Sequence, residues 1–462
     1  MIEPRLLRGF RDYLPAQMLA RHALIEMIRL VYERYGFVPI DTPAIEVRSI
    51  LIGEETDSGD LKIFRFDDPD GRPAGLRFDH TVPLARFVAQ YPDLPRPFKR
   101  YVVGPVWRGD EPGPGRFREF LQCDVDIVGT SSMAADTEII AVIHDTLIEL
   151  GLKHFLIRFS DRKILNALMV LFGLDPFWAM DIFRALDKIE KVGTDAVREI
   201  LTKKGPEGVD QREVPAGARC IGLTPELADR IMEFVAISGD PAETITRLRQ
   251  FFSGCTAADE GIAELEEILA GLTALGIPAE RYTIDLSIAR GLAYYTGPVF
   301  ETKLLGLPDW GSVFSGGRFD GLIGRFSENS IPATGASIGV DRLFAALEQL
   351  GLVGTAPSRT QVLVTVFDRS QLDVYQALAT ELRQAGFNTE LYMGEEIRIG
   401  RQFKYADVQQ IPIAVVVGPD ELSRGEVSVK NLRTTFGEAG KQHSIPRSEM
   451  ISHIRSLLEA VE

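Results

Sequence analysis

The sequence of 462 residues has little cysteine, with only Cys123, Cys220 and Cys255. These three are far apart, and there is no CxxC pair or Cys/His cluster, so neither a disulfide framework nor a structural zinc site is predicted. The sequence also lacks an apolar run of about 20 residues, which a membrane-spanning helix needs. Its first residues lack the apolar stretch of a signal peptide, and we therefore expect a cytoplasmic protein without a membrane partner.

Positive charge is also scarce, because 51 Lys and Arg face 66 Asp and Glu, giving a formal net charge of −15. An excess of basic residues is typical of proteins that bind phosphate backbones. Any RNA partner of this chain would therefore have to bind at local basic patches. No G-x-x-x-x-G-K-[ST] segment occurs, which disfavours a P-loop ATPase. The hydrophobic content of 45% and the charged content of 25% are ordinary for a globular protein of two or three domains.

One stretch of the sequence predicts a strand with two chemically different faces. After a loop rich in Gly and Pro that follows Arg108, polar and apolar side chains alternate with the period of two of a β-strand. The polar face consists of Arg116, Arg118, Phe120, Gln122, Asp124 and Asp126. Such a face can grip phosphates, stack on a base and hold a small cationic ligand. A strand with one solvated face has the same pattern, so the strand alone leaves both interpretations open.

Periodicity divides the rest of the sequence into strand-rich and helix-rich regions. Helical spacing marks residues 15–35 and, more extensively, residues 161–272, whereas strand-like segments fill most of the first 130 residues and return at residue 282. The last hundred residues alternate as βαβαβ, which favours a small α/β domain with a mainly parallel sheet. The predicted parts are a strand-rich domain at 1–165 and 271–350, a helical insertion at 166–270, a linker at 351–360 and the terminal domain at 361–462.

Three further segments place glycine beside groups that can bind ligands. ARGLAYYTG, residues 289–297, and SGGRFDG, residues 315–321, join glycines to arginine and aromatic side chains. Glycine lets a ligand approach the backbone closely, although such an arginine can be structural and a tyrosine pair is more often packing. GASIG, residues 335–339, fits the G-x-S-x-G pattern of serine hydrolases. This match is weak, since the only later histidines, His443 and His453, fall in the terminal domain.

Together these segments resemble the class II aminoacyl-tRNA synthetases. Residues 108–126 resemble motif 2 of that class, and TGASIGVDRLFAAL, residues 334–347, resembles motif 3. ARGLAYYTG and SGGRFDG are similar to two segments peculiar to histidyl-tRNA synthetases. RFDHTVPLARF, residues 77–87, resembles the segment that holds the amino acid's ammonium group, and GFVPIDTPAIE, residues 36–46, resembles the dimer-forming motif 1.

The resemblance covers nearly the whole chain in the expected order. RQFKYAD and GEVSVKNLR, which begin at residues 401 and 425, resemble the anticodon-binding domain of the family. The loop GDEPGPGRFR, residues 109–118, resembles a divergent bacterial branch. The resemblance implies an α+β catalytic domain with an antiparallel sheet flanked by helices, a helical insertion that approaches the tRNA acceptor arm, and a C-terminal α/β anticodon-binding domain.

The resemblance also implies a reaction. The implied enzyme activates L-histidine with ATP to histidyl-adenylate and pyrophosphate, and then transfers histidyl to the 3′-terminal adenosine of tRNA(His). ATP is a substrate, and Mg²⁺ is expected on its phosphates rather than in a metal site of the protein. The implied partners are L-histidine, ATP and tRNA(His), and the implied assembly is a two-fold homodimer.

Carried over residue by residue, the resemblance implies a role for each site residue. Amino-acid binding falls to Asp79, Thr81, Gln122, Asp126, Tyr294 and Tyr295; the first three hold the ammonium group, and Asp126 and Tyr295 read the imidazole. ATP binding falls to Arg108, Arg116, Phe120 and Arg342, with Phe120 on the adenine and Arg342 at the far end of the triphosphate. The implied catalytic residues are Arg108 and Arg290, because two preorganised guanidiniums stabilise the charge that develops on the α-phosphate.

Four positions depart from the family pattern, namely Phe10, Asp126, Ala293 and Phe319. Aspartate is usual in the family at the position of Ala293, and tyrosine at that of Phe319. Catalytically silent paralogues of this fold act as histidine sensors or regulatory subunits, and this alternative stays open. The retained Arg108, Arg290 and Arg342, together with the anticodon-type domain, favour the enzyme.

Overall fold

The computed structural model describes residues 1–53, 63–113, 115–206, 209–215, 217–289, 294–354, 356–433 and 442–459. Arg290 and Ala293, two positions singled out in the sequence, lie outside the described residues. The chain divides into two compact units, one of residues 1–11 and 24–352 and one of residues 12–23 and 353–462. Within the described part of the chain, no helix has the length and apolarity to cross a membrane.

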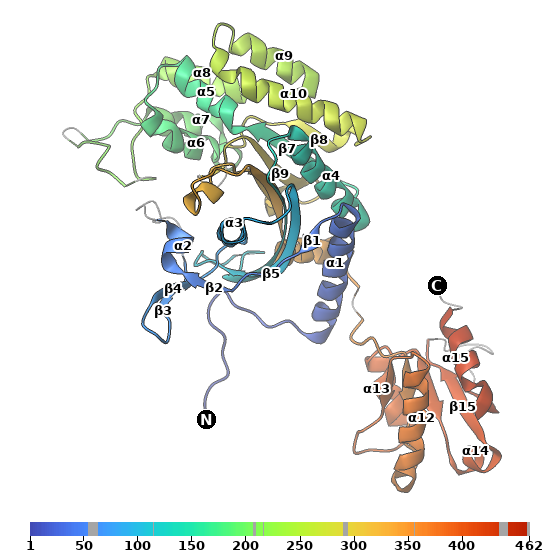
Figure 1. Ribbon diagram of the computed structural model, residues 1–462. Coiled ribbons are helices and arrows are strands. Elements are labelled where there is room, and N and C mark those ends of the chain that lie inside the picture. Colours follow the sequence, from blue (N-terminus) through green and yellow to red (C-terminus); the bar gives the residue numbers. More distant parts are fainter. Residues whose placement is uncertain are drawn as a thin grey trace. The chain divides into compact units, whose positions relative to one another are not determined.

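An eight-stranded sheet forms the centre of the first unit (Figure 1), in the order β1-β5-β6-β11-β10-β9-β7-β8. Its strands are β1 (Val38–Pro39), β5 (Phe98–Trp107), β6 (Glu119–Val128), β7 (Phe155–Asp161), β8 (Tyr282–Ile284), β9 (Pro298–Leu304), β10 (Ser312–Arg318) and β11 (Ala333–Gly339). The six inner strands pair antiparallel, whereas the edge strands β1 and β8 run parallel to their neighbours. The predicted antiparallel catalytic sheet is therefore confirmed.

The strand predicted from alternation is β6, but it begins at Glu119 because the chain before it closes a tight hairpin between Gly113 and Arg116. β6 lies between β5 and β11 and pairs with both. Its apolar face is buried, with Cys123 and Val125 fully covered. The hydroxyl of Tyr32 lies 3.5 Å from the carbonyl oxygen of Cys123, to which it donates. The polar side chains of β6 therefore occupy the face opposite this helix contact.

Helices cover the sheet. They include α1 (Pro15–Arg34), α3 (Thr81–Gln90), α4 (Met133–Glu149) and α11 (Val340–Gln349), whereas α2 (Arg48–Ile52) packs on α3. Figure 1 shows α3 end-on within the curve of the sheet. Leu84 and Val88 of α3 pack with Val128 and Ala333 in one buried cluster, which fixes this helix against β6 and β11. A small sheet of β2 (Ile45–Val47), β4 (Pro73–Leu76) and β3 (Arg65–Asp67), in that order, lies next to α2.

The predicted helix-rich region contains six α-helices within the described residues. They are α5 (Arg162–Leu171), α6 (Ala179–Leu186), α7 (Ile189–Thr202), α8 (Pro225–Val235), α9 (Pro241–Phe251) and α10 (Asp259–Ala274). Side-chain caps start three of them, because Asp161, Thr224 and Asp240 accept backbone N–H groups in the first turns of α5, α8 and α9. Phe234, Phe251 and Phe252 pack ring against ring between α8 and α9.

The second unit is built on a five-stranded sheet in the order β13-β12-β14-β15-β16. Its elements are β12 (Val362–Val364), α12 (Leu372–Gln384), β13 (Thr389–Leu391), α13 (Ile399–Val408), β14 (Ile413–Val416), α14 (Pro419–Arg424), β15 (Glu426–Asn431), β16 (Gln442–Pro446) and α15 (Met450–Glu459). The first three strands are parallel, but β15 and β16 join antiparallel. The α/β class is thus confirmed, whereas the mainly parallel sheet was wrong, since two later strands extend it.

Candidate active site

The predicted polar face is buried from Gln122 to Asp126, so the interpretation of a solvated strand face is wrong for this part of it. Gln122 is 8% exposed, and Asp124 and Asp126 are each 3% exposed. Gly335 of β11 pairs with Asp126, and a Cβ there would lie 2.0 Å from Oδ1 of that carboxylate. Only glycine at this position leaves room for the Asp126 side chain over the neighbouring strand.

Asp126 lies at one end of this face against a fully buried arginine. Nη2 of Arg100, on β5, is 2.7 Å from Oδ2 of Asp126. Burial raises the pKa of Asp126 to about 7; Arg100 opposes the rise, and Asp124 and Asp79 add to it. Burial also raises the pKa of Tyr295, with Asp126 the largest neighbouring charge. A carboxyl group that titrates near neutrality and a neutral phenol thus face the same space, and together they can accept and donate hydrogen bonds to a small polar ring.

The start of α3 brings a second buried carboxyl group to the site. Asp79 accepts the backbone N–H of Val82 at 3.1 Å. Burial raises the pKa of Asp79 to about 6, against the nearby charge of Arg108. Thr81, the first residue of α3, lies close to Tyr294, whose pKa is raised by burial. The segments around residues 79 and 294, which are distant in sequence, therefore meet beside β6.

His80, between Asp79 and Thr81 in the sequence, is 2% exposed, and its ring contacts the backbone of β5. Nε2 of His80 lies 3.1 Å from the carbonyl oxygen of Gly104. Nη2 of Arg100 donates to the carbonyl oxygen of His80 at 3.3 Å. Burial lowers the pKa of His80 to about 4. The ring is therefore neutral at physiological pH, and it braces the start of α3 against β5.

Arginine and aromatic side chains mark the other end of β6. Nε of Arg108 donates to the carbonyl oxygen of Phe78 at 2.8 Å, and its guanidinium carbon lies 5.3 Å from the ring centre of Phe120. Arg342 of α11 donates from Nη1 to the carbonyl oxygen of Ser312 at 2.9 Å. A Cβ built on Gly115 would lie 3.7 Å from Cγ of Arg342, so the hairpin before β6 reaches this arginine. Arg116, in the same hairpin, is exposed.

Two contacts fix β6 relative to the next elements. The backbone N–H of Leu121 donates to Oδ2 of Asp341 at 2.6 Å, which ties β6 to α11. Nε2 of Gln122 donates to the hydroxyl of Ser337 at 2.7 Å. Ser337 lies inside the β11 ladder, paired with Asp124 and Ser315, and not on a turn between a strand and a helix. The serine hydrolase interpretation of GASIG is therefore unsupported, because a nucleophile elbow needs that turn.

The structure brings most of the predicted site residues to β6 and the segments around it, and it adds Arg100, which the sequence did not single out. No local pattern marks Arg100, because its partners come from other elements. His80 and Ser337 lie in segments that the sequence did single out, and the structure gives them supporting contacts that the sequence did not predict. Of the departures from the family pattern, Phe319 is 1% exposed and its ring lies 6.0 Å from that of Tyr294. Phe10 packs edge-on against Phe64 at 6.0 Å between ring centres. Both phenylalanines therefore have apolar packing roles.

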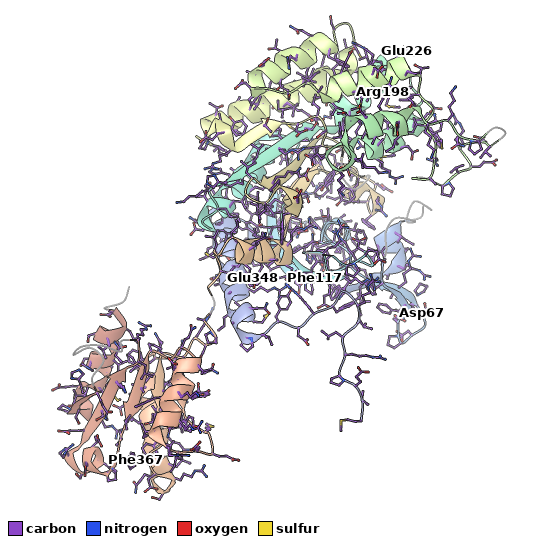
Figure 2. The ribbon with its side chains drawn as sticks, turned by 180° about the vertical axis from the view of Figure 1, so that it is seen from behind. Asp67, Phe117, Arg198, Glu226, Glu348 and Phe367 are labelled. Carbon is purple, nitrogen blue, oxygen red and sulfur yellow. The ribbon has the colours of Figure 1, made fainter. Side chains whose placement is uncertain are left out.

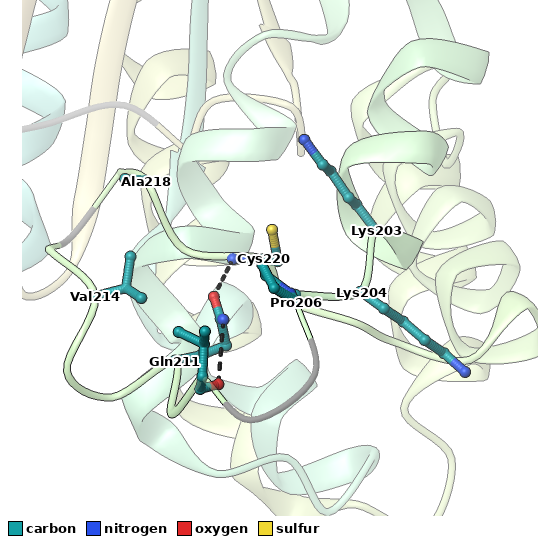
Figure 3. A pocket seen from close by; sticks show the side chains of 9 residues that line it. Lys203, Lys204, Pro206, Gln211, Val214, Ala218 and Cys220 are labelled. Atoms are coloured by element: carbon teal, nitrogen blue, oxygen red, sulfur yellow. Dashed lines mark hydrogen bonds between the residues drawn. The ribbon is translucent and has the colours of Figure 1, made fainter.

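The helical region contains a separate cavity of about 550 Å³ (Figure 3), lined by Lys203, Lys204, Gly205, Pro206, Val209, Gln211, Val214, Ala218 and Cys220. Oε1 of Gln211 accepts the backbone N–H of Cys220 at 2.9 Å and so closes the loop. Figure 3 shows the side chains of Lys203 and Lys204 pointing apart, so they do not converge on one anion. Among the described residues, no group of three or more His, Cys, Asp or Glu side chains is placed to hold a metal ion.

Comparison with known proteins assigns both units to families. The family model described as Histidyl-tRNA synthetase matches residues 9–343, and that described as Anticodon binding domain matches residues 361–457. The histidine–tRNA ligase of Rhodopirellula baltica is 43% identical over 435 residues, covering 94% of each chain. That of Paracoccus denitrificans is 41% identical over 483 residues, covering 98% of this chain and 97% of its own.

A solved structure agrees with these sequence relatives. The crystal structure of histidyl-tRNA synthetase from Nostoc sp. PCC 7120 superposes with a TM-score of 0.82 at 32% identity, covering 99% of this chain and 100% of that one. Both the sequence and the fold therefore match over nearly the full length. The chain belongs to the histidyl-tRNA synthetase family.

Proposed function

We infer that the protein is a histidine–tRNA ligase, which activates L-histidine with ATP and then esterifies the 3′-terminal adenosine of tRNA(His). One observation of the structure carries this inference: β6 places buried acceptors for an amino acid, Gln122 and Asp126, on the same strand as Phe120, whose ring lies beside Arg108 at the end of β5. The alternative of a histidine sensor has no comparable support, because Arg108, Arg290 and Arg342, to which we assign phosphate contacts, and the anticodon-type domain are all present.

We propose that the amino acid lies along the polar face of β6 with its imidazole toward Asp126. Asp126 and the hydroxyl of Tyr295 would contact the two ring nitrogens, since one group can accept and the other can donate. Asp79, Thr81 and Gln122 would hold the ammonium group, with Tyr294 packed beside Thr81. The pairing of Arg100 with Asp126 keeps that carboxylate in place before the ligand arrives.

ATP would occupy the other end of β6, with its adenine on Phe120 and its triphosphate extending to Arg342 and the exposed Arg116. In the first step a carboxylate oxygen of histidine attacks the α-phosphorus, the bond to the β-phosphate oxygen breaks, and pyrophosphate leaves. Arg108 would stabilise the charge that develops on the α-phosphate, together with Arg290, which lies outside the described residues. No general base is needed, because the attacking carboxylate is already ionised. Mg²⁺ bound to the ATP phosphates would neutralise part of their charge.

Pyrophosphate exchange into ATP, measured with each of the twenty amino acids and without tRNA, tests this function. We expect exchange with histidine alone, and replacing Arg108 by methionine should reduce it by roughly 100-fold or more, as loss of a transition-state donor does. The exposed Arg72, replaced in the same way, serves as the matched control and should leave exchange unchanged. Histidine binding without exchange would instead identify a sensor.

We further propose that the second unit stacks the anticodon bases on Phe367. This side chain follows β12, is 45% exposed, and lies at one end of the unit (Figure 2). Met393, which follows the parallel neighbour β13, is 84% exposed. Arg369 donates to the carbonyl oxygen of Glu395 at 2.6 Å and thereby links the two loops. Ligands of parallel sheets usually bind at the carboxyl ends of the strands, and bases stack on aromatic rings there without needing a strongly basic surface.

The helical region at 166–270 would approach the acceptor arm of the tRNA, where Lys203 and Lys204 offer separate phosphate contacts. We also propose a cytoplasmic homodimer. Three apolar side chains of the segment that resembles motif 1, or next to it, are about half exposed: Val38 is 49%, Ile45 51% and Val47 56% exposed. Replacing Val47 by aspartate should shift the mass measured by light scattering from dimer to monomer, whereas an unchanged mass would place the dimer interface elsewhere.

A further inference from the structure

Three acceptor oxygens near the start of α3 and on β6 are buried with neither a hydrogen-bond nor an ion-pair partner among the residues that the structure describes. They are Oδ2 of Asp79, Oε1 of Gln122 and Oδ1 of Asp124. Their residues are 4%, 8% and 3% exposed. A buried acceptor left unpaired destabilises the folded state, and more so when it is charged. Three such oxygens in one region therefore point to a missing donor group.

Asp124 lies centrally among the groups of the site. It lies two residues from Gln122 and two from Asp126, so all three side chains share one face of β6. Asp124 is close enough to Asp79 to act on that carboxyl group electrostatically, and both act on Tyr295. Arg100, the fully buried cation of the neighbouring strand, is paired with Asp126 and donates to the backbone of His80. Asp124 thus faces the space between the other acceptors without an ion pair among the described residues.

The chemistry of these oxygens selects the donor. Two carboxylates can only accept when ionised, and the amide of Gln122 presents its oxygen because its nitrogen donates to Ser337. A primary ammonium group carries one positive charge and three N–H donors, so it can satisfy one N–H bond at each of three oxygens. A metal ion fits less well, since the described residues contain no metal-ligating group of three such side chains. The complement of this set is therefore an ammonium group.

We propose that Asp124 is a specificity-determining residue that accepts a hydrogen bond from the α-ammonium group of the amino acid, beside Asp79 and Gln122. This assignment rests on the proposed ligase function and adds to it a residue with no role in the set inferred from the sequence. Oδ1 of Asp124 is an acceptor without a hydrogen-bond partner among the described residues, so it adds to the contacts proposed for Asp79, Thr81 and Gln122. A carboxylate at this point favours ligands with a free amine over deaminated or N-acylated analogues. Such analogues lack the ammonium group and would leave the buried acceptors unpaired.

Calorimetric titration of three ligands tests the proposal. L-histidine has the ammonium and carboxylate groups, histidinol has only the ammonium group, and 3-(imidazol-4-yl)propionate has only the carboxylate group. For Asp124→Asn we expect the dissociation constants of L-histidine and histidinol to rise roughly 10- to 100-fold, and that of the deaminated acid to stay within about 2-fold. The matched control Glu119→Gln changes an exposed carboxylate of the same strand, which contacts Trp107, and should leave all three constants unchanged.

Equal weakening of all three ligands, or no weakening of any, would overturn the assignment of Asp124. Asp124→Ala repeats the test with a smaller side chain, and urea unfolding shows whether either variant is folded. Pyrophosphate exchange by the unaltered protein tests the ligase function separately. If histidine supports no exchange but the loss of affinity is still confined to ammonium-bearing ligands, the proposed ligase function is wrong and the assignment of Asp124 to the ammonium group is still supported.

Discussion

Two buried arginines of the same sheet have very different surroundings. Arg318, at the end of β10, is 1% exposed, and its terminal nitrogens donate to Asp136, to Asp320 at 3.3 Å and to the carbonyl oxygens of Thr130 and Ser132 at 3.1 and 3.2 Å. Arg100, on β5, is fully buried and has one carboxylate and one carbonyl partner.

The carboxylates around these arginines differ in the same way. Asp136 forms an ion pair with Arg318, whereas Asp79 and Asp124 near Arg100 have no ion pair among the described residues, and each keeps an oxygen without a hydrogen-bond partner there. The protein surrounds the guanidinium of Arg318 with acceptors, and these contacts hold α4 and the loop after β10 in place. Around Arg100 it leaves acceptors open. The difference separates a network that supports the fold from one that a ligand completes, and the following experiments test that separation.

The largest effect is expected from breaking the support network. Arg318→Met leaves Asp136 buried without its cation, and the free energy of unfolding of the first unit should fall by about 3–5 kcal/mol. Urea titration followed by far-UV circular dichroism measures it. The double variant Arg318→Met, Asp136→Leu should recover much of the loss, because it removes the unpaired charge. Asp124→Asn, in contrast, should leave the unfolding free energy unchanged or raise it, and a loss above 3 kcal/mol there would erase the distinction.

Two buried groups near Arg100 should make the free energy of unfolding depend on pH, and their contributions should have opposite signs. The folded pKa of Asp126 is raised to about 7, so the folded state binds more protons than the unfolded chain, and this group's contribution to stability is lost as pH rises from about 4 to 7. The folded pKa of His80 is lowered to about 4, so the unfolded chain binds more protons, and stability from this group increases between about pH 4 and 6.5.

Melting curves of two variants separate these contributions. Relative to the unaltered protein, His80→Gln should become less stable by about 3 kcal/mol from pH 4 to 6.5, because one pKa unit corresponds to about 1.4 kcal/mol. Asp126→Asn should become relatively more stable from pH 4 to 7. The slope against pH is the readout, since each substitution also removes contacts. Parallel curves for all three proteins would contradict the assignment.

A smaller effect should separate the two units of the chain. Phe367→Ala removes the proposed stacking surface, and the kcat/KM for aminoacylation of tRNA should fall roughly 5- to 100-fold, since base–aromatic stacking contributes about 1–3 kcal/mol. Pyrophosphate exchange, which needs only the first unit's site, should not change. The exposed Phe66 of β3 provides a matched alanine control. An equal loss in both assays would mean that Phe367 acts through folding and not through the RNA.

The smallest effect concerns Phe319, which belongs to the packed side of the comparison. Phe319→Tyr introduces a hydroxyl group into a cluster with Leu84, Ile323 and Ala333, and should cost on the order of 1 kcal/mol of stability. The KM for histidine in pyrophosphate exchange should stay within about 2-fold, because the ring packs on Tyr294 rather than lining the open acceptors. A clear fall in KM would instead show that a hydroxyl here completes the amino-acid site.

Local periodicity was enough to predict the main elements of the first unit. The alternation that ends at Ile127 predicted β6, because neighbouring side chains of a strand point to opposite faces. It also separated Gln122 and Asp126 from the apolar face. It did not predict that the polar face is buried, since burial depends on α3 and β11, which are brought to β6 by pairings far along the chain.

The features that could not be predicted from the sequence are those whose structural role depends on such pairings between distant strands. Arg100 became part of the site only because β5 pairs its position with Asp126. In the second unit, Val427 and Val429 alternate with Ser428, a signal for β15 that was present but too short to outweigh the βαβαβ pattern. That strand adds antiparallel to β14, and the expected parallel sheet became a mixed one.

The position of β6 between β5 and β11 has a consequence for synthesis. The ribosome delivers β5 and β6 within the first 128 residues, but β11 begins only at Ala333. The helices α5 to α10 lie between these strands in the sequence and can begin to form while the hairpin of β5 and β6 still has one open edge. An open edge can pair with the wrong strand, and buried aspartates along it oppose such pairing by repulsion and desolvation. On this argument Asp124 and Asp126 would disfavour wrong pairing of β6 until β11 has been synthesised.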